Sequence, residues 1–139
     1  MRRFVSLLFC LLLSLPAFAE RKETFGELAV HYSVFNSSFL QPDIAAAVGL
    51  NRSKTIGVLN ISALKDGQGQ PAKVSGSVKN LLGQSSSLQF KQVLESGAVY
   101  YLAEFPLRQR EVLTFTIQVQ VGDGAPNTLT FNQEVFPDE

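Results

Sequence analysis

The side chains of this sequence that are suited to acid–base chemistry are few, and the single histidine, His31, is the first of them. It heads the segment HYSVFNSSFL, residues 31–40, in which three small polar residues stand between aromatic ones. A serine hydrolase would need this imidazole beside an activated serine and a carboxylate. The G-x-S-x-G sequence that often carries such a serine does not occur in the chain. A hydrolase that uses His31 is therefore only a weak alternative, and we assign no catalytic residue.

The residues that usually bind metals or cofactors are also few in this chain. Metal centres use several His, Cys or clustered carboxylate ligands. This chain has one His and one Cys, and its acidic residues are scattered. The glycines form no phosphate-binding loop. We therefore predict no metal site and no cofactor.

The polar residues of 31–40 have a structural interpretation and a binding one. If Leu28, Val30, Tyr32 and Val34 face the core, then His31 faces outward and the strand ends near Asn36. Asn-Ser-Ser at that point suits side-chain hydrogen bonds to the backbone of a turn, which is the interpretation we favour. The alternative is a ligand or partner contact made by the same side chains.

The segment GLNRSK, residues 49–54, offers a second candidate contact. It is expected to be a solvated loop, although an arginine there would suit an anion or a peptide terminus because its guanidinium is a planar donor fork. Across the two segments and the following strand, the candidate binding residues are His31, Asn36, Ser37, Arg52, Ser53 and Asn60.

Two adjacent leucines, Leu81 and Leu82, lie in the irregular stretch NLLGQSSS. They are either plugs of the core or an exposed apolar contact for a partner. Replacing both with serine would separate these alternatives, because a plug mutant would lose stability and a contact mutant would lose a partner.

The elements that position these residues are read from hydrophobic periodicity. EVLTFTIQVQV, residues 111–121, alternates apolar and polar residues with period two, which is typical of a half-buried strand. TIGVLNISAL is apolar on both faces, as a central strand would be, and a hairpin is expected between LQFKQVLE and AVYYLAEF around Ser96-Gly97. Further strands are expected in GELAVHYSVF, AKVSGSVKN and TLTFNQEVF.

One segment departs from this pattern. QPDIAAAVG places Pro42 at a first helical position and Gly49 at the end, which predicts a short helix over 42–48. Together with about seven strands at regular spacing, this predicts an all-β, antiparallel sandwich of the immunoglobulin-like type. A small barrel is the alternative.

The first residues predict the compartment. MRRFVSLLFCLLLSLPAFAE has a basic start, an apolar run from Phe4 to Leu15 and the triplet Ala17-Phe18-Ala19, as in a secretory signal peptide. We expect cleavage after Ala19 and a mature domain over 20–139. Cys10 lies inside the apolar run, so the mature chain would have no cysteine.

Charge limits the partners of the mature chain. The sequence has 12 Lys+Arg and 12 Asp+Glu, and Arg2 and Arg3 belong to the predicted signal peptide. The remaining slight excess of acidic residues makes nucleic acid an unsuitable partner. No second apolar segment reaches the length of a membrane span.

The sequence of residues 31–62 resembles a known family. The run H-Y-x-x-F-N-S-S-F-L-x-P-x-I-A, followed by N-R-S-K and L-N-I-S, is similar to a family of small secreted proteins of Gram-negative bacteria classified as a domain of unknown function. The resemblance extends over essentially the whole mature chain. It implies a periplasmic protein with an immunoglobulin-like sandwich, and it implies no activity. His31, Asn36, Arg52 and Asn60 are matching positions, and no role comes with them.

These observations favour a non-enzymatic periplasmic module that binds a protein or an extended peptide, as a monomer or weak dimer. Such sandwiches add a peptide strand at an open sheet edge or present loops. The edge would be the first strand, near Phe25, or the last, near Phe136. The alternative is a carrier of a small apolar or anionic ligand between the sheets. The 11 Phe of the chain could surround such a ligand, although phenylalanines usually fill the core.

Overall fold

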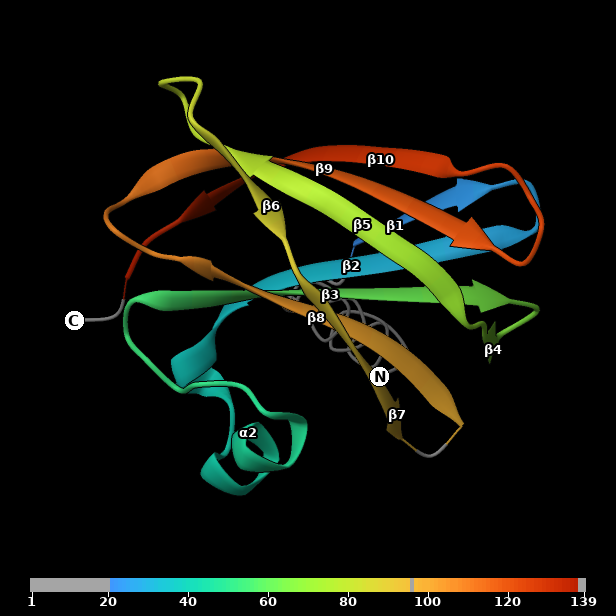
Figure 1. Ribbon diagram of the computed structural model, residues 1–139, viewed down its shortest axis with the longest axis horizontal. Helices are drawn as coiled ribbons and strands as arrows, with labels where there is room; N and C mark the ends of the chain where they lie inside the picture. The colour runs from blue at the N-terminus through green and yellow to red at the C-terminus, as the bar shows by residue number, and fades with distance from the viewer. Residues whose placement is uncertain (1–20, 96, 138–139) are drawn as a thin grey trace, which may run out of the picture.

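The computed structural model describes residues 21–95 and 97–137, and the predicted signal peptide and its cleavage site lie outside them. The described chain forms ten strands, one α-helix and one 3-10 turn (Figure 1). In chain order these elements are β1 (Arg21–Phe25), β2 (Leu28–Asn36), η1 (Ser37–Phe39), α2 (Pro42–Val48), β3 (Ile56–Lys65), β4 (Gln68–Gly69), β5 (Ala72–Lys79), β6 (Ser85–Leu88), β7 (Phe90–Glu95), β8 (Ala98–Pro106), β9 (Glu111–Val121) and β10 (Asn127–Val135).

The strands form two antiparallel sheets that pack face to face. The larger sheet has the order β1-β2-β3-β8-β7, with β4 paired to β3, and the smaller one has the order β10-β9-β5-β6. The orders β2-β3-β8-β7 and β10-β9-β5 correspond to the A-B-E-D and G-F-C sheets of immunoglobulin domains. The predicted immunoglobulin-like sandwich is thus confirmed.

The core lies between the sheets and follows the alternation of the sequence. On β9 the inward residues Leu113, Phe115, Ile117 and Val119 are buried, as the period-two pattern predicted. Four aromatic rings run through this layer in mutual contact. Tyr32 stacks on Phe131 with 4.3 Å between ring centres, Phe131 stacks on Phe115 at 5.1 Å, and Phe115 meets Phe105 edge to face at 5.2 Å. These phenylalanines therefore fill the core.

Three strand assignments differ from the prediction of about seven strands. β1 was missed, and it folds back onto β2 through a two-residue turn in which Gly26 has φ +60°. The two-residue strand β4 was also missed, and it follows a turn in which Asp66 and Gly67 have positive φ. The predicted strand of residues 88–95 is two strands, because Leu88 pairs with Gly76 of the smaller sheet whereas Phe90 pairs with Ala103 of the larger one.

The helix matches its predicted range, with Pro42 at its start and Gly49 in the left-handed region at its end. Two hydrogen bonds hold its C-terminal connection against the outer face of the larger sheet: Lys91 Nζ donates to the Gly49 carbonyl (2.6 Å) and the Asn51 amide donates to Glu104 Oε2 (3.3 Å). None of the helices in the described residues is long and apolar enough to cross a membrane.

Candidate functional site

Four of the sequence-predicted residues come together where β2 ends. The Ser37 hydroxyl donates to the Ser53 carbonyl (3.0 Å) and accepts from the Ser53 amide (2.9 Å). Arg52 Nη2 donates to the Ser38 carbonyl at 3.2 Å, and Asn36 Nδ2 donates to the Phe136 carbonyl at 3.1 Å. Ser37 is fully buried, so its hydroxyl joins two segments of the chain instead of facing a ligand.

His31 and Asn60 lie elsewhere, on the outer face of the larger sheet. His31 of β2 is opposite Ser62 of β3, and Ser33 is opposite Asn60, so the two candidates are diagonal neighbours on one face. Both are half-buried. Asn60 Oδ1 is a buried atom for which the described residues supply no hydrogen-bond partner. The structure therefore places these two residues away from Asn36, Ser37, Arg52 and Ser53, which we name the loop cluster.

Leu81 and Leu82 lie at the tip of the connection between β5 and β6, with 79% and 82% of their surfaces exposed. Their exposure excludes the interpretation as core plugs. The turn beneath them is held by Asn80, whose Oδ1 accepts from the amides of Leu82 and Gln84 (3.0 Å each) and whose Nδ2 donates to Gln84 Oε1 (2.8 Å). The leucines are thus presented on an ordered turn.

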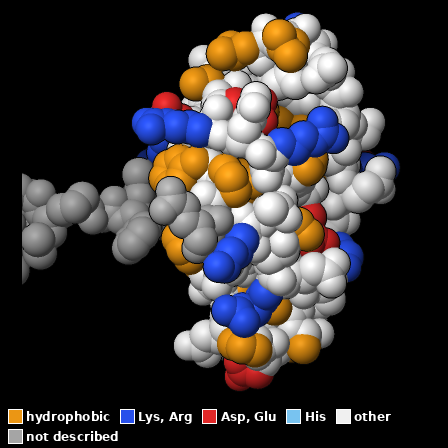
Figure 2. Space-filling view, turned by 90° about the vertical axis from the view of Figure 1, so that its left-hand side faces the viewer, with side chains coloured by type: hydrophobic (Ala, Val, Ile, Leu, Met, Phe, Trp, Pro, Cys, Tyr) orange, Lys and Arg blue, Asp and Glu red, His pale blue; other side chains and the backbone are white. Residues whose placement is uncertain are grey.

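This turn, residues 80–84, which we name the leucine turn, belongs to the same end of the sandwich as the loop cluster. β2, β8 and β10 finish at this end and β3 and β9 begin there, as Figure 1 shows. Figure 2 looks onto this end, where hydrophobic side chains form several separate groups with Lys and Arg between them. Exposed large hydrophobic residues in the segments that meet here are Phe39, Leu81, Leu82 and Phe136.

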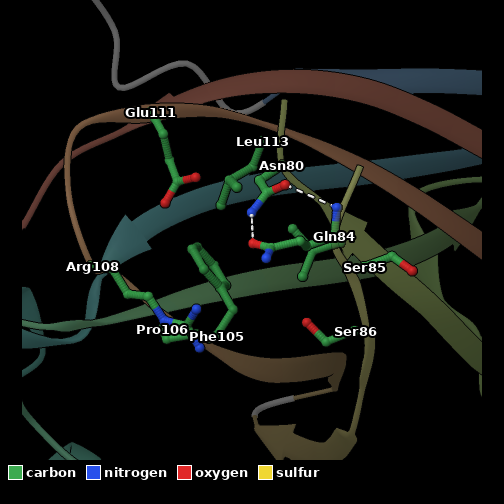
Figure 3. A pocket seen from close by; sticks show the side chains of 10 residues that line it. Asn80, Gln84, Ser85, Ser86, Phe105, Pro106, Arg108, Glu111 and Leu113 are labelled. Atoms are coloured by element: carbon green, nitrogen blue, oxygen red, sulfur yellow. Dashed lines mark hydrogen bonds between the residues drawn. The ribbon is translucent and has the colours of Figure 1, made fainter. Parts of the chain in front are cut away.

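This end of the sandwich also contains a pocket that the sequence did not predict. It has a volume of about 320 Å³ and opens between the two sheets (Figure 3). We name it the end pocket, and its lining residues are Val78, Asn80, Gln84, Ser85, Ser86, Phe105, Pro106, Arg108, Glu111 and Leu113. These residues come from β5, β6, β8, β9 and two connections, so no sequence motif joins them.

The described residues contain no group of three or more His, Cys, Asp or Glu that could hold a metal ion. His31 does not line the end pocket, because it lies on the outer face of the larger sheet. The described residues that line the end pocket include apolar side chains, side-chain amides and hydroxyls, and the charges of Arg108 and Glu111.

Comparisons with known proteins agree with the fold. No curated protein matches the sequence. A crystal structure of a DUF4426 family protein from Pseudomonas aeruginosa is 52% identical, has a TM-score of 0.81, and is matched over 86% of this chain and 97% of that chain.

More distant structures share the fold alone. A copper-bound variant of FetP from uropathogenic Escherichia coli strain F11 is 14% identical, with a TM-score of 0.64 over 86% of this chain and 96% of that chain. FetP "as isolated" after expression in the periplasm is 13% identical, with a TM-score of 0.58 over 87% and 96% of the two chains. The model of the family described as "Domain of unknown function (DUF4426)" matches residues 22–138, and the chain belongs to that family.

Proposed function

We propose that this chain is a non-enzymatic periplasmic interaction module that binds another protein through the leucine turn, residues 80–84. The observation that carries the proposal is the exposure of Leu81 and Leu82 on a turn that the Asn80 side chain holds in place. Adjacent, largely exposed leucines are uncommon on a soluble surface unless they contact something. A preformed turn also loses little conformational entropy on binding. The partner expected is a periplasmic protein with an apolar recess.

Loop presentation is better supported than strand addition. The predicted first edge, β2, is covered by β1, which is itself the edge of the larger sheet and whose Arg21 side chain reaches across to β10. β10 is an edge, but one carbonyl group of the strand and one just beyond it are occupied: Arg21 Nη1 donates to the Asn132 carbonyl (3.4 Å), and Asn36 Nδ2 donates to the Phe136 carbonyl. A peptide strand would have to displace both donors.

We do not propose for this chain the copper binding that one of the FetP structures shows. Copper sites in proteins use imidazole, thiolate and thioether ligands. This sequence has one residue of each kind, and Cys10 and Met1 lie in the predicted signal peptide. The likeness to FetP supports a periplasmic module of this fold and no particular ligand.

The periplasmic location rests on the predicted signal peptide, and the likeness to FetP is consistent with it. Cleavage after Ala19 would leave Glu20 as the first residue of the mature chain. Intact-mass measurement of protein purified from the periplasm should give the mass of residues 20–139. A full-length mass in the membrane fraction would contradict the proposal.

The docking proposal is tested by changing Leu81 and Leu82 to Ser together. The matched control is Leu94→Ser, since Leu94 is also largely exposed (70%) but lies at the other end of the sandwich. Crosslinking in the periplasm, followed by mass spectrometry, should recover a partner with the native protein and with the control, and at least tenfold less of it with the double variant. The free energy of unfolding should change by less than about 0.5 kcal/mol, as for ordinary surface substitutions.

Equal recovery with the double variant and the control would contradict docking through the leucine turn. Recovery of a second copy of this chain in place of another protein would contradict the proposed class of partner. Native mass spectrometry of the crosslinked species distinguishes these outcomes.

A further inference from the structure

The end pocket is a part of the inter-sheet space that the core leaves unfilled. Its floor is made by the buried side chains of Val78 and Leu113 from the smaller sheet and Phe105 from the larger one. On β6, Ser86 is opposite Val78 and lies on the same side of the strand as the buried Leu88. Ser86 therefore faces the inter-sheet space, yet it is exposed, because no side chain of the described residues fills the pocket in front of it.

Two opposite charges stand on one side of this apolar floor. Figure 3 shows Arg108 and Glu111 on that side, with Gln84 and Ser86 across the pocket. Within the described residues, neither the Arg108 guanidinium nor the Glu111 carboxylate has a hydrogen-bond or ion-pair partner. The neighbouring Arg110 differs, since its Nη2 lies 3.1 Å from Glu134 Oε1. Arg110 of the β8–β9 connection is thus paired with Glu134 of β10 outside the pocket, whereas Arg108 of the same connection and Glu111 at the start of β9 are, among the residues that the structure describes, unpaired charges at the rim of the pocket.

The side-chain amides of Asn80 and Gln84 at the pocket are joined by a hydrogen bond. Asn80 Nδ2 donates to Gln84 Oε1, and Asn80 Oδ1 accepts from two backbone amides of the turn. They shape the wall without offering those atoms to a ligand. The groups that remain to bind a ligand include the apolar floor, Gln84 Nε2, the Ser86 hydroxyl, the Arg108 cation and the Glu111 anion.

We propose that the end pocket binds a small zwitterion with an apolar side chain, either a free apolar amino acid or a dipeptide. Its carboxylate would accept from the planar fork of Arg108, which suits carboxylates. Its ammonium group would donate to Glu111, and its side chain would cover Phe105 and Leu113. The volume of about 320 Å³ is at the small end of the range of ligand pockets, about 300–1,000 Å³, which limits the ligand to one or two residues.

This inference goes beyond the docking proposal and does not depend on it. Leu81 and Leu82 do not line the pocket, so the two sites can be changed separately. A protein with Leu81 and Leu82 changed to Ser should bind the zwitterion as the native protein does. A variant at Arg108 should still be recovered with the protein partner.

The test is a titration of the isotopically labelled mature protein with L-leucine and leucyl-leucine, followed by NMR. N-acetyl-L-leucine, which lacks the ammonium group, and L-leucinamide, which lacks the carboxylate, are the matched ligands. We expect shifts in residues that line the pocket, and affinities at least tenfold lower for both blocked ligands.

Substitutions of Arg108 and Glu111 should separate the contributions of the two charges to ligand binding. Arg108→Gln should weaken L-leucine at least tenfold and leave L-leucinamide unchanged, whereas Glu111→Gln should weaken L-leucine and leave N-acetyl-L-leucine unchanged. Arg110→Gln, at the exposed arginine that is paired outside the pocket, should have no effect. Ser86→Leu, which fills the pocket without altering its charge, should abolish binding of every ligand.

The proposal is overturned if millimolar L-leucine and leucyl-leucine shift no pocket residue in the folded native protein. It is also overturned if the blocked ligands bind as well as the zwitterions, since the pocket would then be a purely apolar site. Equal losses for Arg108→Gln and Arg110→Gln would show general charge attraction and would contradict a specific carboxylate contact. Amide spectra of each variant show whether it is folded.

Discussion

The guanidinium carbon of Arg21 lies 4.9 Å from the centre of the Phe131 ring, and this contact joins the first strand of the larger sheet to the last strand of the smaller one. The same group lies 5.0 Å from the centre of the Tyr32 ring, and its Nη2 donates to Gln133 Oε1 at 2.6 Å. β1 and β10 are edge strands of different sheets. Arg21 therefore links the two sheets along one side of the sandwich.

Arg21→Ala should lower the free energy of unfolding by about 1–2 kcal/mol, because a partly buried cation–π contact and a charged hydrogen bond are lost together. The control is Arg110→Ala, which breaks an exposed ion pair with Glu134 and should cost less than about 1 kcal/mol. The chain has no Trp, so urea unfolding is followed by circular dichroism. Equal effects of the two substitutions would contradict a special role for Arg21.

Ser37→Ala should destabilise the fold by about 1–3 kcal/mol, because the backbone amide and carbonyl of Ser53 would both lose their partner in a buried place. Ser75→Ala, at an exposed position of β5, is the control and should be nearly neutral. Urea unfolding measures both. If Ser37→Ala were as stable as native protein, the two hydrogen bonds to Ser53 would contribute nothing measurable to stability, which would contradict this role of the hydroxyl.

Gly57→Ala should destabilise the core through Phe105. The two residues are opposite each other on β3 and β8, and an added Cβ would lie 2.6 Å from Cε2 of the ring. We expect a loss of about 1–3 kcal/mol, as in other overpacked cores.

Phe105→Leu in the Gly57→Ala background supplies the second half of a double-mutant cycle. The smaller side chain should relieve part of the clash, so the two losses should not add. Strictly additive losses would show that the strain lies elsewhere.

Tyr101→Phe should cost about 1 kcal/mol, because the phenolic oxygen accepts from the Ala72 amide at 2.7 Å and from Gln92 Nε2 at 3.0 Å. This oxygen connects the start of β5 to both β8 and β7. The control is Tyr100→Phe, one residue earlier on the other face of β8, where the described residues give the hydroxyl no partner. Hydrogen exchange at Ala72 should accelerate in Tyr101→Phe only, and equal exchange in both variants would contradict the connection.

Much of the fold was predictable because it depends on local chemistry. Pro42 and Gly49 delimit the helix through their own backbone preferences. The period-two pattern of residues 111–121 identified the buried face of β9, since alternation is a property of any half-buried strand. The Asp66-Gly67 turn also depends on local chemistry, because both residues tolerate positive φ.

The candidate site was predictable only in part. Asn36, Ser37, Arg52 and Ser53 were candidate binding residues of two separate segments, and the structure brings them together where β2 ends. The sequence did not show that their hydrogen-bonding groups serve one another. It also could not choose between a buried and an exposed position for Leu81 and Leu82, because both occur in loops that contain paired leucines.

Tertiary structure decided which strands pair and where space remains between the sheets. Leu88 and Phe90 continue one alternating pattern, yet they join different sheets, because the partner of a strand is chosen by residues far along the chain. The end pocket has the same origin, since Val78, Phe105 and Leu113 meet only when the two sheets pack. Local sequence therefore determined which residues form strands and face inward, and long-range pairing determined which of them meet and what surface they leave open.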